Sequence, residues 1–125
     1  MKLDFTTDPT LPSLGLVVLQ SDETIEQEFR QIFGPEQLIY VSRGPCATEV
    51  GRDTLQEMAA TLPTAAGLFP VAADLATVGY ACTSGTAQIG AAKVAELVRE
   101  GCDTPHVTDP LTALIAACGA LGITR

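Results

Sequence analysis

One apolar segment, 14-LGLVVLQ-20, constrains the fold more than any other part of the chain. It is a continuous apolar run with β-branched residues at its centre, and apolar and polar positions do not alternate along it. Such a run is typical of a strand that is covered on both faces, as strands of parallel sheets are. We therefore expect helices to follow this strand and to pack against the sheet.

Strand and helix signals do alternate along the rest of the chain. Further strands are predicted at 38–43, 76–82 and 105–109, and helices at 21–34, about 49–62, 91–101 and 110–121. Pro63 should end the second helix, 64–75 should form short helical turns, and 83–90 should be a loop. This alternation predicts an α/β fold: a flavodoxin-like, doubly wound sheet of about four parallel strands with helices on both faces.

The first and last of the predicted helices each have an apolar face. In the first helix, Ile25, Phe29 and Ile32 recur at helical spacing and should lie on the sheet. In the last helix, Asp109 or Thr108 should act as the cap, with Pro110 at the first position. Its apolar stripe is expected to face the core and consists of Leu111, Leu114, Ile115, Cys118 and Leu121.

The composition limits the kind of protein. The 125 residues, 46% hydrophobic and 18% charged, suit a single domain that spans 1–125 and buries a real core. A net charge of −8 disfavours nucleic acid, which is bound largely through Lys and Arg. No apolar segment approaches the roughly 20 residues of a membrane span, and the N-terminus does not resemble a signal peptide. We expect a cytoplasmic protein that binds neither nucleic acid nor membrane.

The four cysteines must be judged one at a time. They show no CxxC spacing, and the chain has a single histidine, so the pattern argues against both a zinc site and a disulfide framework. Cys118 is expected in the core, and Cys46 and Cys102 have no evident partner. His106 lies inside the short fourth strand and is expected to be structural.

Cys82 is different because it is expected at the end of the third strand. Ligands of open parallel sheets bind beyond the carboxyl ends of the strands. Thr83, Ser84 and the amides that follow could hold a carboxylate or enolate oxygen, and Gly85 would allow a ligand to approach closely. A thiolate beside them could add to a double bond or remove an acidic proton. The alternative is that Cys82 is a small buried hydrophobe.

Two charged residues are expected at the ends of the neighbouring strands. Asp22 could face the same cleft as Cys82, or it could simply cap the first helix. Arg43 could bind a substrate carboxylate, or it could form a salt bridge between elements. The first strand is not followed by a Walker or GxGxxG loop, which argues against a nucleotide site.

Four segments together resemble one family. They are 15-GLVVLQSDETIEQEF-29, 40-YVSRGP-45, 79-GYACTSGTAQIG-90 and 108-TDPLTALIAACGALGITR-125. They are similar to the maleate isomerase and arylmalonate decarboxylase branch of the aspartate/glutamate racemase superfamily. The resemblance implies a cofactor-independent protein with two flavodoxin-like halves, an active site between them, and in many members one cysteine from each half. This chain resembles the N-terminal half only.

The resemblance assigns roles to individual residues. Cys82 matches the catalytic cysteine of the first half, and Thr83 and Ser84 match the hydroxyl pair that binds a carboxylate. Asp22 stands where the isomerases usually have an asparagine, so its role as a substrate contact departs from the pattern. Arg43 matches an arginine common in the group.

The resemblance implies a cysteine-dependent isomerase or racemase-type domain acting on a small carboxylate or dicarboxylate, as a maleate cis-trans isomerase does. The alternative is a truncated or degenerate module that binds a small carboxylate or only self-associates. Because the second half is missing, half a site should not catalyse well alone. We therefore expect a homo-oligomer in which two copies present Cys82 to each other.

Overall fold

The computed structural model describes residues 11–46 and 51–124, apart from the side chains at positions 52 and 55. These residues form one four-stranded parallel sheet with the order β2-β1-β3-β4. The strands are β1 (Ser13–Leu19), β2 (Ile39–Gly44), β3 (Leu75–Tyr80) and β4 (His106–Thr108). The flavodoxin-like α/β fold predicted from the alternating pattern is confirmed, and each predicted strand is present with its ends shifted slightly.

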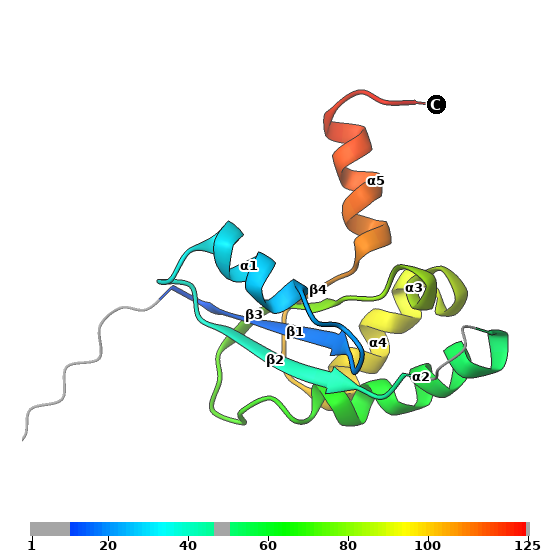
Figure 1. Ribbon diagram of the computed structural model, residues 1–125, viewed down its shortest axis with the longest axis horizontal. Helices are drawn as coiled ribbons and strands as arrows, with labels where there is room; N and C mark the ends of the chain where they lie inside the picture. Colours follow the sequence, from blue (N-terminus) through cyan, green and yellow to red (C-terminus); the bar gives the residue numbers. More distant parts are fainter. Residues whose placement is uncertain (1–10, 47–50, 125) are drawn as a thin grey trace, which may run out of the picture.

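The helices are α1 (Ile25–Phe33), α2 (Arg52–Ala66), α3 (Thr83–Ile89), α4 (Ala91–Gly101) and α5 (Pro110–Ala120). Figure 1 shows α1 on one face of the sheet and α2 and α4 on the other, while α5 projects away from the body. Among the described residues, no helix is long and apolar enough to cross a membrane.

The hydrophobic core lies between the sheet and the pair α2 and α4. Val17 of β1 and Val78 of β3 meet Val94 and Val98 of α4 there, and all four are almost completely buried. Leu62, in the C-terminal half of α2, belongs to the same buried cluster. The core is aliphatic, and it explains why β1 and β3 are apolar on the face that α2 and α4 cover.

The opposite face of the sheet is covered less completely. No residue of α1 is fully buried. Of the predicted inward face, Ile25 and Phe29 are partly buried, whereas Ile32 is 73% exposed. An apolar groove of about 270 Å³ remains open beside α1. We call it the α1 groove; it is lined by Leu14, Gly15, Leu16, Phe29, Phe33, Ile39, Thr77, Gly79 and Thr108.

The prediction that Pro63 ends the second helix is wrong. Helix α2 continues through Pro63 to Ala66, and it ends where the N–H of Gly67 donates to the carbonyl of Pro63 at 2.9 Å. Proline removes one helical hydrogen bond. Leu62 and Ala65, on either side of it, are buried in the core, and their packing outweighs that loss.

The prediction of a loop over 83–90 is also wrong, because Thr83–Ile89 forms α3. Its sequence has little apolar periodicity, which is why the helix was not expected. The carbonyl of Cys82 accepts hydrogen bonds from both the N–H and the hydroxyl of Thr86, at 3.0 and 2.8 Å. Thr86 is completely buried, and its two bonds hold the first turn of α3 in place.

Helix α5 has the predicted start but not the predicted environment. The carboxylate of Asp109 accepts the N–H of Thr112 at 2.8 Å, and Pro110 follows at the first position. None of its residues is buried: Leu114 and Ile115 are 58% and 66% exposed, and Cys118 is only half-buried rather than part of the core. The apolar stripe points to solvent because α5 leaves the sheet and contacts chiefly α3 (Figure 1).

Candidate functional site

The carboxyl ends of β1, β2 and β3 meet at one edge of the sheet. Leu19 pairs with Gly44, and the N–H of Ala81 extends the β3 ladder by donating to Val17 at 2.8 Å. The loops that follow these strands are therefore neighbours. All the site residues that we predicted lie at this edge: Arg43 at the end of β2, Asp22 in the loop after β1, Cys82 after β3, and Thr83 and Ser84 at the start of α3.

Cys82 lies beyond the end of β3 and caps α3. Its backbone is extended, and its Sγ accepts the N–H of Gly85 at 3.2 Å. The Oγ of Ser84 lies 4.0 Å from the same sulfur. Cys82 is only 6% exposed, so the thiol sits just under the surface with one backbone donor directed at it. We predicted a strand residue here, and the structure instead makes it the residue on which a helix begins.

Gly85 is required by space rather than by a turn. A methyl group at this position would lie 2.7 Å from the Tyr80 hydroxyl oxygen and 2.9 Å from the Cys82 sulfur, both closer than real contacts. A side chain at position 85 would therefore push either the hydroxyl or the thiol away. The two groups converge on this glycine from β3 and from the cap of α3.

Thr83 and Ser84 are exposed on the first turn of α3, in contrast to buried Cys82 and Thr86. Their hydroxyls are therefore open to solvent beside a thiol that is nearly enclosed. Hydroxyl and backbone N–H donors of this kind suit an anion with two oxygens.

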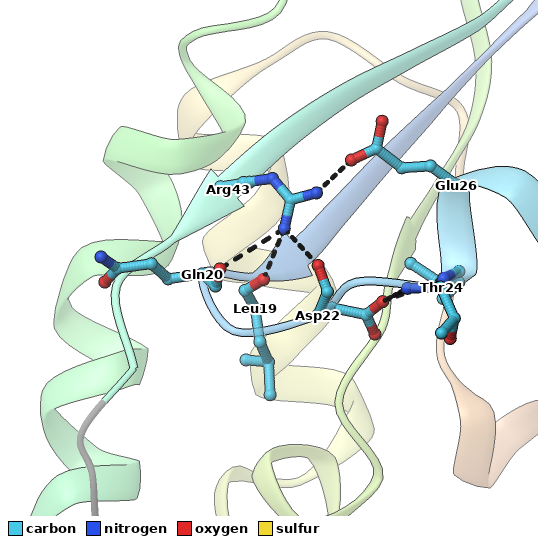
Figure 2. Close-up of polar contacts among 7 residues, drawn as sticks. Leu19, Gln20, Asp22, Thr24, Glu26 and Arg43 are labelled. Carbon is cyan, nitrogen blue, oxygen red and sulfur yellow. Dashed lines mark hydrogen bonds and ion pairs between the residues drawn. The ribbon is translucent and has the colours of Figure 1, made fainter.

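Asp22 lies two residues before Thr24, the N-cap of α1, and its side chain holds the start of the helix. Its Oδ1 accepts the backbone N–H groups of Thr24 and Ile25 at 3.0 and 2.9 Å, and the bond to Thr24 can be followed in Figure 2. Of the two interpretations offered for Asp22, the structure contains the capping geometry. Its contact with a substrate stays a prediction.

Arg43 is engaged with the loop between β1 and α1. Its Nη1 donates to the carbonyl oxygens of Leu19, Asp22 and, at the limit of hydrogen-bond distance, Gln20, and its Nη2 forms an ion pair with Glu26 (Figure 2). One guanidinium thus ties the end of β2 to the loop that carries Asp22. Of the two roles considered for Arg43, the structure contains the salt bridge between elements. A substrate contact for Arg43 stays a prediction.

Cys46 was considered incidental, but the structure places it at the same edge of the sheet. Its thiol donates to the hydroxyl oxygen of Ser21 at 3.3 Å, and it borders a pocket of about 200 Å³ between the end of β2 and α2. Hydrogen bonding by the Ser21 side chain lowers the pKa of Cys46, because the hydroxyl stabilises the thiolate. The signal in the sequence is its position just after the Gly44-Pro45 end of a strand.

Tyr80 is a second residue that sequence reasoning missed. It is the last residue of β3 and is 3% exposed. Burial raises the pKa of its hydroxyl above the ordinary tyrosine value, and the adjacent Cys82 raises it further.

Cys102 is remote from this edge of the sheet. The pKa of its thiol is raised, chiefly by burial and to a smaller extent by the negative charge of Asp103. Among the described residues, no group of three or more His, Cys, Asp or Glu could hold a metal ion.

Two solved structures resemble this chain. The maleate isomerase Iso from Pseudomonas putida S16 superposes with a TM-score of 0.67 and 25% identity, covering 89% of this chain. A cysteine-to-alanine variant of that isomerase with maleate gives a TM-score of 0.63 and 23% identity, covering 88% of this chain. The chain spans 50% of the length of either. No family model and no curated protein matches the sequence. The resemblance to maleate isomerase that was predicted from the motifs is confirmed.

Proposed function

We propose that this chain forms one half of a cofactor-independent, cysteine-dependent isomerase or racemase-type site for a small carboxylate, with Cys82 as its thiol. The observation that carries the proposal is the geometry of the α3 cap. The Cys82 sulfur accepts the N–H of Gly85, and the hydroxyls of Thr83 and Ser84 stand exposed beside it. The likeness to a maleate isomerase supports an unsaturated dicarboxylate as the substrate class.

The chemistry needs only groups of this kind. The thiolate of Cys82 adds to one carbon of the double bond, forming a carbon–sulfur bond as the π bond breaks. The electron pair moves into the adjacent carboxylate, where the hydroxyls of Thr83 and Ser84 can hold the added charge. Rotation about the resulting single bond and expulsion of the thiolate then give the trans isomer. No proton or electron is gained or lost over the cycle.

We further propose that a second copy of this chain completes the site. Helix α5 has no charged residue between Pro110 and Ala120, and it exposes Leu114 and Ile115 to solvent. On a chain of net charge −8, α5 is a surface that can meet another copy without bringing like charges together. The α1 groove is likewise lined by uncharged residues and could receive it. A reciprocal contact of this kind closes with twofold symmetry.

One observation favours the second candidate function, a non-catalytic module that binds a carboxylate or only self-associates. Cys82 is 6% exposed and belongs to the buried cluster with Val17, Val78 and Val98. A cysteine in that position also fits a small apolar core residue. The two candidates differ in whether the thiol is reactive in the folded chain.

The rate at which each cysteine is alkylated, measured against pH and mapped by peptide mass, separates the candidates. Cys46 is replaced by serine beforehand, because its lowered pKa would let it compete for the reagent. In this background Cys82 should react faster than Cys102 and Cys118 in the folded chain. If Cys82 reacts only when the chain unfolds, the enzyme proposal fails. Proton NMR of maleate incubated with the chain, and with a Cys82→Ala control, then tests turnover.

A further inference from the structure

The Tyr80 hydroxyl is an anomaly in an otherwise satisfied interior. Among the described residues it is the one buried side-chain oxygen or nitrogen that has no hydrogen-bond partner. Buried polar groups in native proteins are nearly always paired, because an unpaired one keeps the full cost of its desolvation. Phenylalanine would fill the same space without that cost. The hydroxyl therefore calls for a partner that the resting structure does not supply.

The hydroxyl lies close to the Cys82 sulfur, beside Gly85. Both atoms lie against the same face of Gly85, at 2.7 and 2.9 Å from the point where a Cβ would stand. Cys82 is close enough to raise the pKa of Tyr80, although the two side chains do not meet the geometry of a hydrogen bond. The absence of a side chain at position 85 is what allows this approach.

We propose that Tyr80 is a positioning residue for Cys82, and that its hydroxyl donates a hydrogen bond to the sulfur once the thiol has ionised. A neutral thiol is a weak acceptor, which leaves the hydroxyl unpartnered in the resting state. A thiolate is a strong acceptor and would be held by two donors, the N–H of Gly85 and the hydroxyl of Tyr80. This inference rests on the proposed function, because it assumes that Cys82 works as a thiolate.

The surroundings make the hydroxyl a dependable donor. Its raised pKa keeps it protonated over the range in which a thiol ionises. Among the side chains that the structure describes, helices α2 and α4 contribute only apolar groups to the buried layer around it: Leu62, Ala65, Ala66, Val94, Leu97 and Val98. The residues of α3 are uncharged, and Asp109 at the start of α5 is occupied by the N–H and hydroxyl of Thr112. Cys82 is thus the group whose charge acts on Tyr80.

The test compares Tyr80→Phe with Tyr40→Phe, the same substitution at the only other tyrosine, both in the Cys46→Ser background. Iodoacetamide alkylation of Cys82 is followed against pH. Tyr80→Phe should raise the apparent pKa of Cys82 by about one unit, which lowers its rate about tenfold at pH values below the pKa. The limiting rate at high pH should change little, and Tyr40→Phe should leave the whole profile unchanged.

A reciprocal measurement does not depend on the Phe variant. Ionisation of Tyr80, followed by tyrosinate absorbance, should occur at a lower pH in Cys82→Ser than in the parent chain, since coupling between two sites acts equally in both directions. An unchanged Cys82 profile in Tyr80→Phe, with a gain in thermal stability, would overturn the inference while leaving the proposed function intact. If Cys82 of the parent chain reacts no faster than Cys102, the proposed function falls as well.

Discussion

The backbone N–H of Gly85 donates to the sulfur of Cys82 at 3.2 Å, so the residue that opens space beneath α3 also supplies a donor to the thiol. The glycine has no positive φ, and its role is to allow Tyr80 and Cys82 to approach its Cα. The three residues form one unit at the carboxyl end of β3. Changes to any one of them should register on the other two.

Replacing Gly85 with alanine should destabilise the fold. The new methyl group would meet the Tyr80 oxygen and the Cys82 sulfur at 2.7 and 2.9 Å, and overpacking of this kind costs about 1–3 kcal/mol. Urea unfolding measures the loss. Gly119→Ala is the matched control, since a methyl group there meets nothing within 4 Å and replaces a helical glycine. That variant should keep or gain stability, by up to about 1 kcal/mol. Equal effects of the two substitutions would contradict the role given to Gly85.

The hydroxyls of Thr83 and Ser84 should give Cys82 a preference for anionic reagents. Iodoacetate and iodoacetamide differ in carrying a carboxylate or a neutral amide, and a chain of net charge −8 should disfavour the former at ordinary sites. We expect the ratio of iodoacetate to iodoacetamide rates to be several-fold higher at Cys82 than at Cys46. Ser84→Ala and Thr83→Val should each reduce that ratio at Cys82 alone. A ratio that is the same at both cysteines would mean that no carboxylate site exists.

Cys46 should become less reactive near neutral pH when Ser21 is changed to alanine. Once Cys46 has lost its proton, the Ser21 hydroxyl can donate to the sulfur, and this lowers the pKa of Cys46. Removing the hydroxyl should return the pKa towards the ordinary value. A smaller fraction of Cys46 is then ionised at pH 7, and alkylation slows there but not well above the pKa. Ser84→Ala serves as the control at the other cysteine. A Cys46 profile that does not move would show that Ser21 does not set it.

Arg43 should contribute more to stability than an ordinary surface cation. It donates to the carbonyls of Leu19 and Asp22 and pairs with Glu26, whereas the exposed Lys93 pairs with a single residue of its own helix. Arg43→Met should therefore cost about 1–2 kcal/mol, and Lys93→Met should cost clearly less, because solvent screens an exposed pair. Denaturant titrations of both variants measure the difference. If the two losses are equal, the ties to the loop between β1 and α1 carry no weight.

Charge introduced on α5 should separate the copies of a dimer. Ile115 is 66% exposed, so Ile115→Glu should not disturb the core of the single chain. At an interface it would bury a charge, and we expect a shift from dimer to monomer in sedimentation velocity at micromolar concentration. Ala60→Glu, at an exposed position on α2, should leave the dimer unchanged. A parent chain that is already monomeric under these conditions contradicts the second-copy proposal.

Sequence patterns were sufficient for the sheet and for the position of the thiol. The apolar run of β1 and the strand–helix alternation determine the parallel topology, because the period and length of such patterns report burial directly. The same patterns placed Cys82 beside Thr83 and Ser84 at a strand end. The patterns could not predict two tertiary contacts. One is the packing of Ala65, which stabilises the part of α2 that follows Pro63, and the other is the approach of Tyr80 to Gly85.

The prediction for α5 fails for a related reason. An apolar stripe shows that a helix face is to be covered, but it does not say by what. From the sequence we interpreted the stripe as part of this chain's own core. In the structure Leu114 and Ile115 of that stripe are exposed. Asp22 and Arg43 show the opposite case. Both alternatives were named from the sequence, and only the local hydrogen bonds distinguish a cap or a tie from a free side chain.

Because α5 projects from the body, its helical structure is weakly stabilised by the rest of the chain. A helix of 11 residues that buries none of them is shorter than the roughly 12–15 residues at which isolated helices become even marginally stable in water. Its cap at Asp109 holds the first turn, and the later turns depend on whatever covers them. Amide hydrogen exchange along α5 should therefore slow as protein concentration rises, while that of β1 stays constant. The exchange rates of the α5 amides would then measure the assembly of two copies without any attached label.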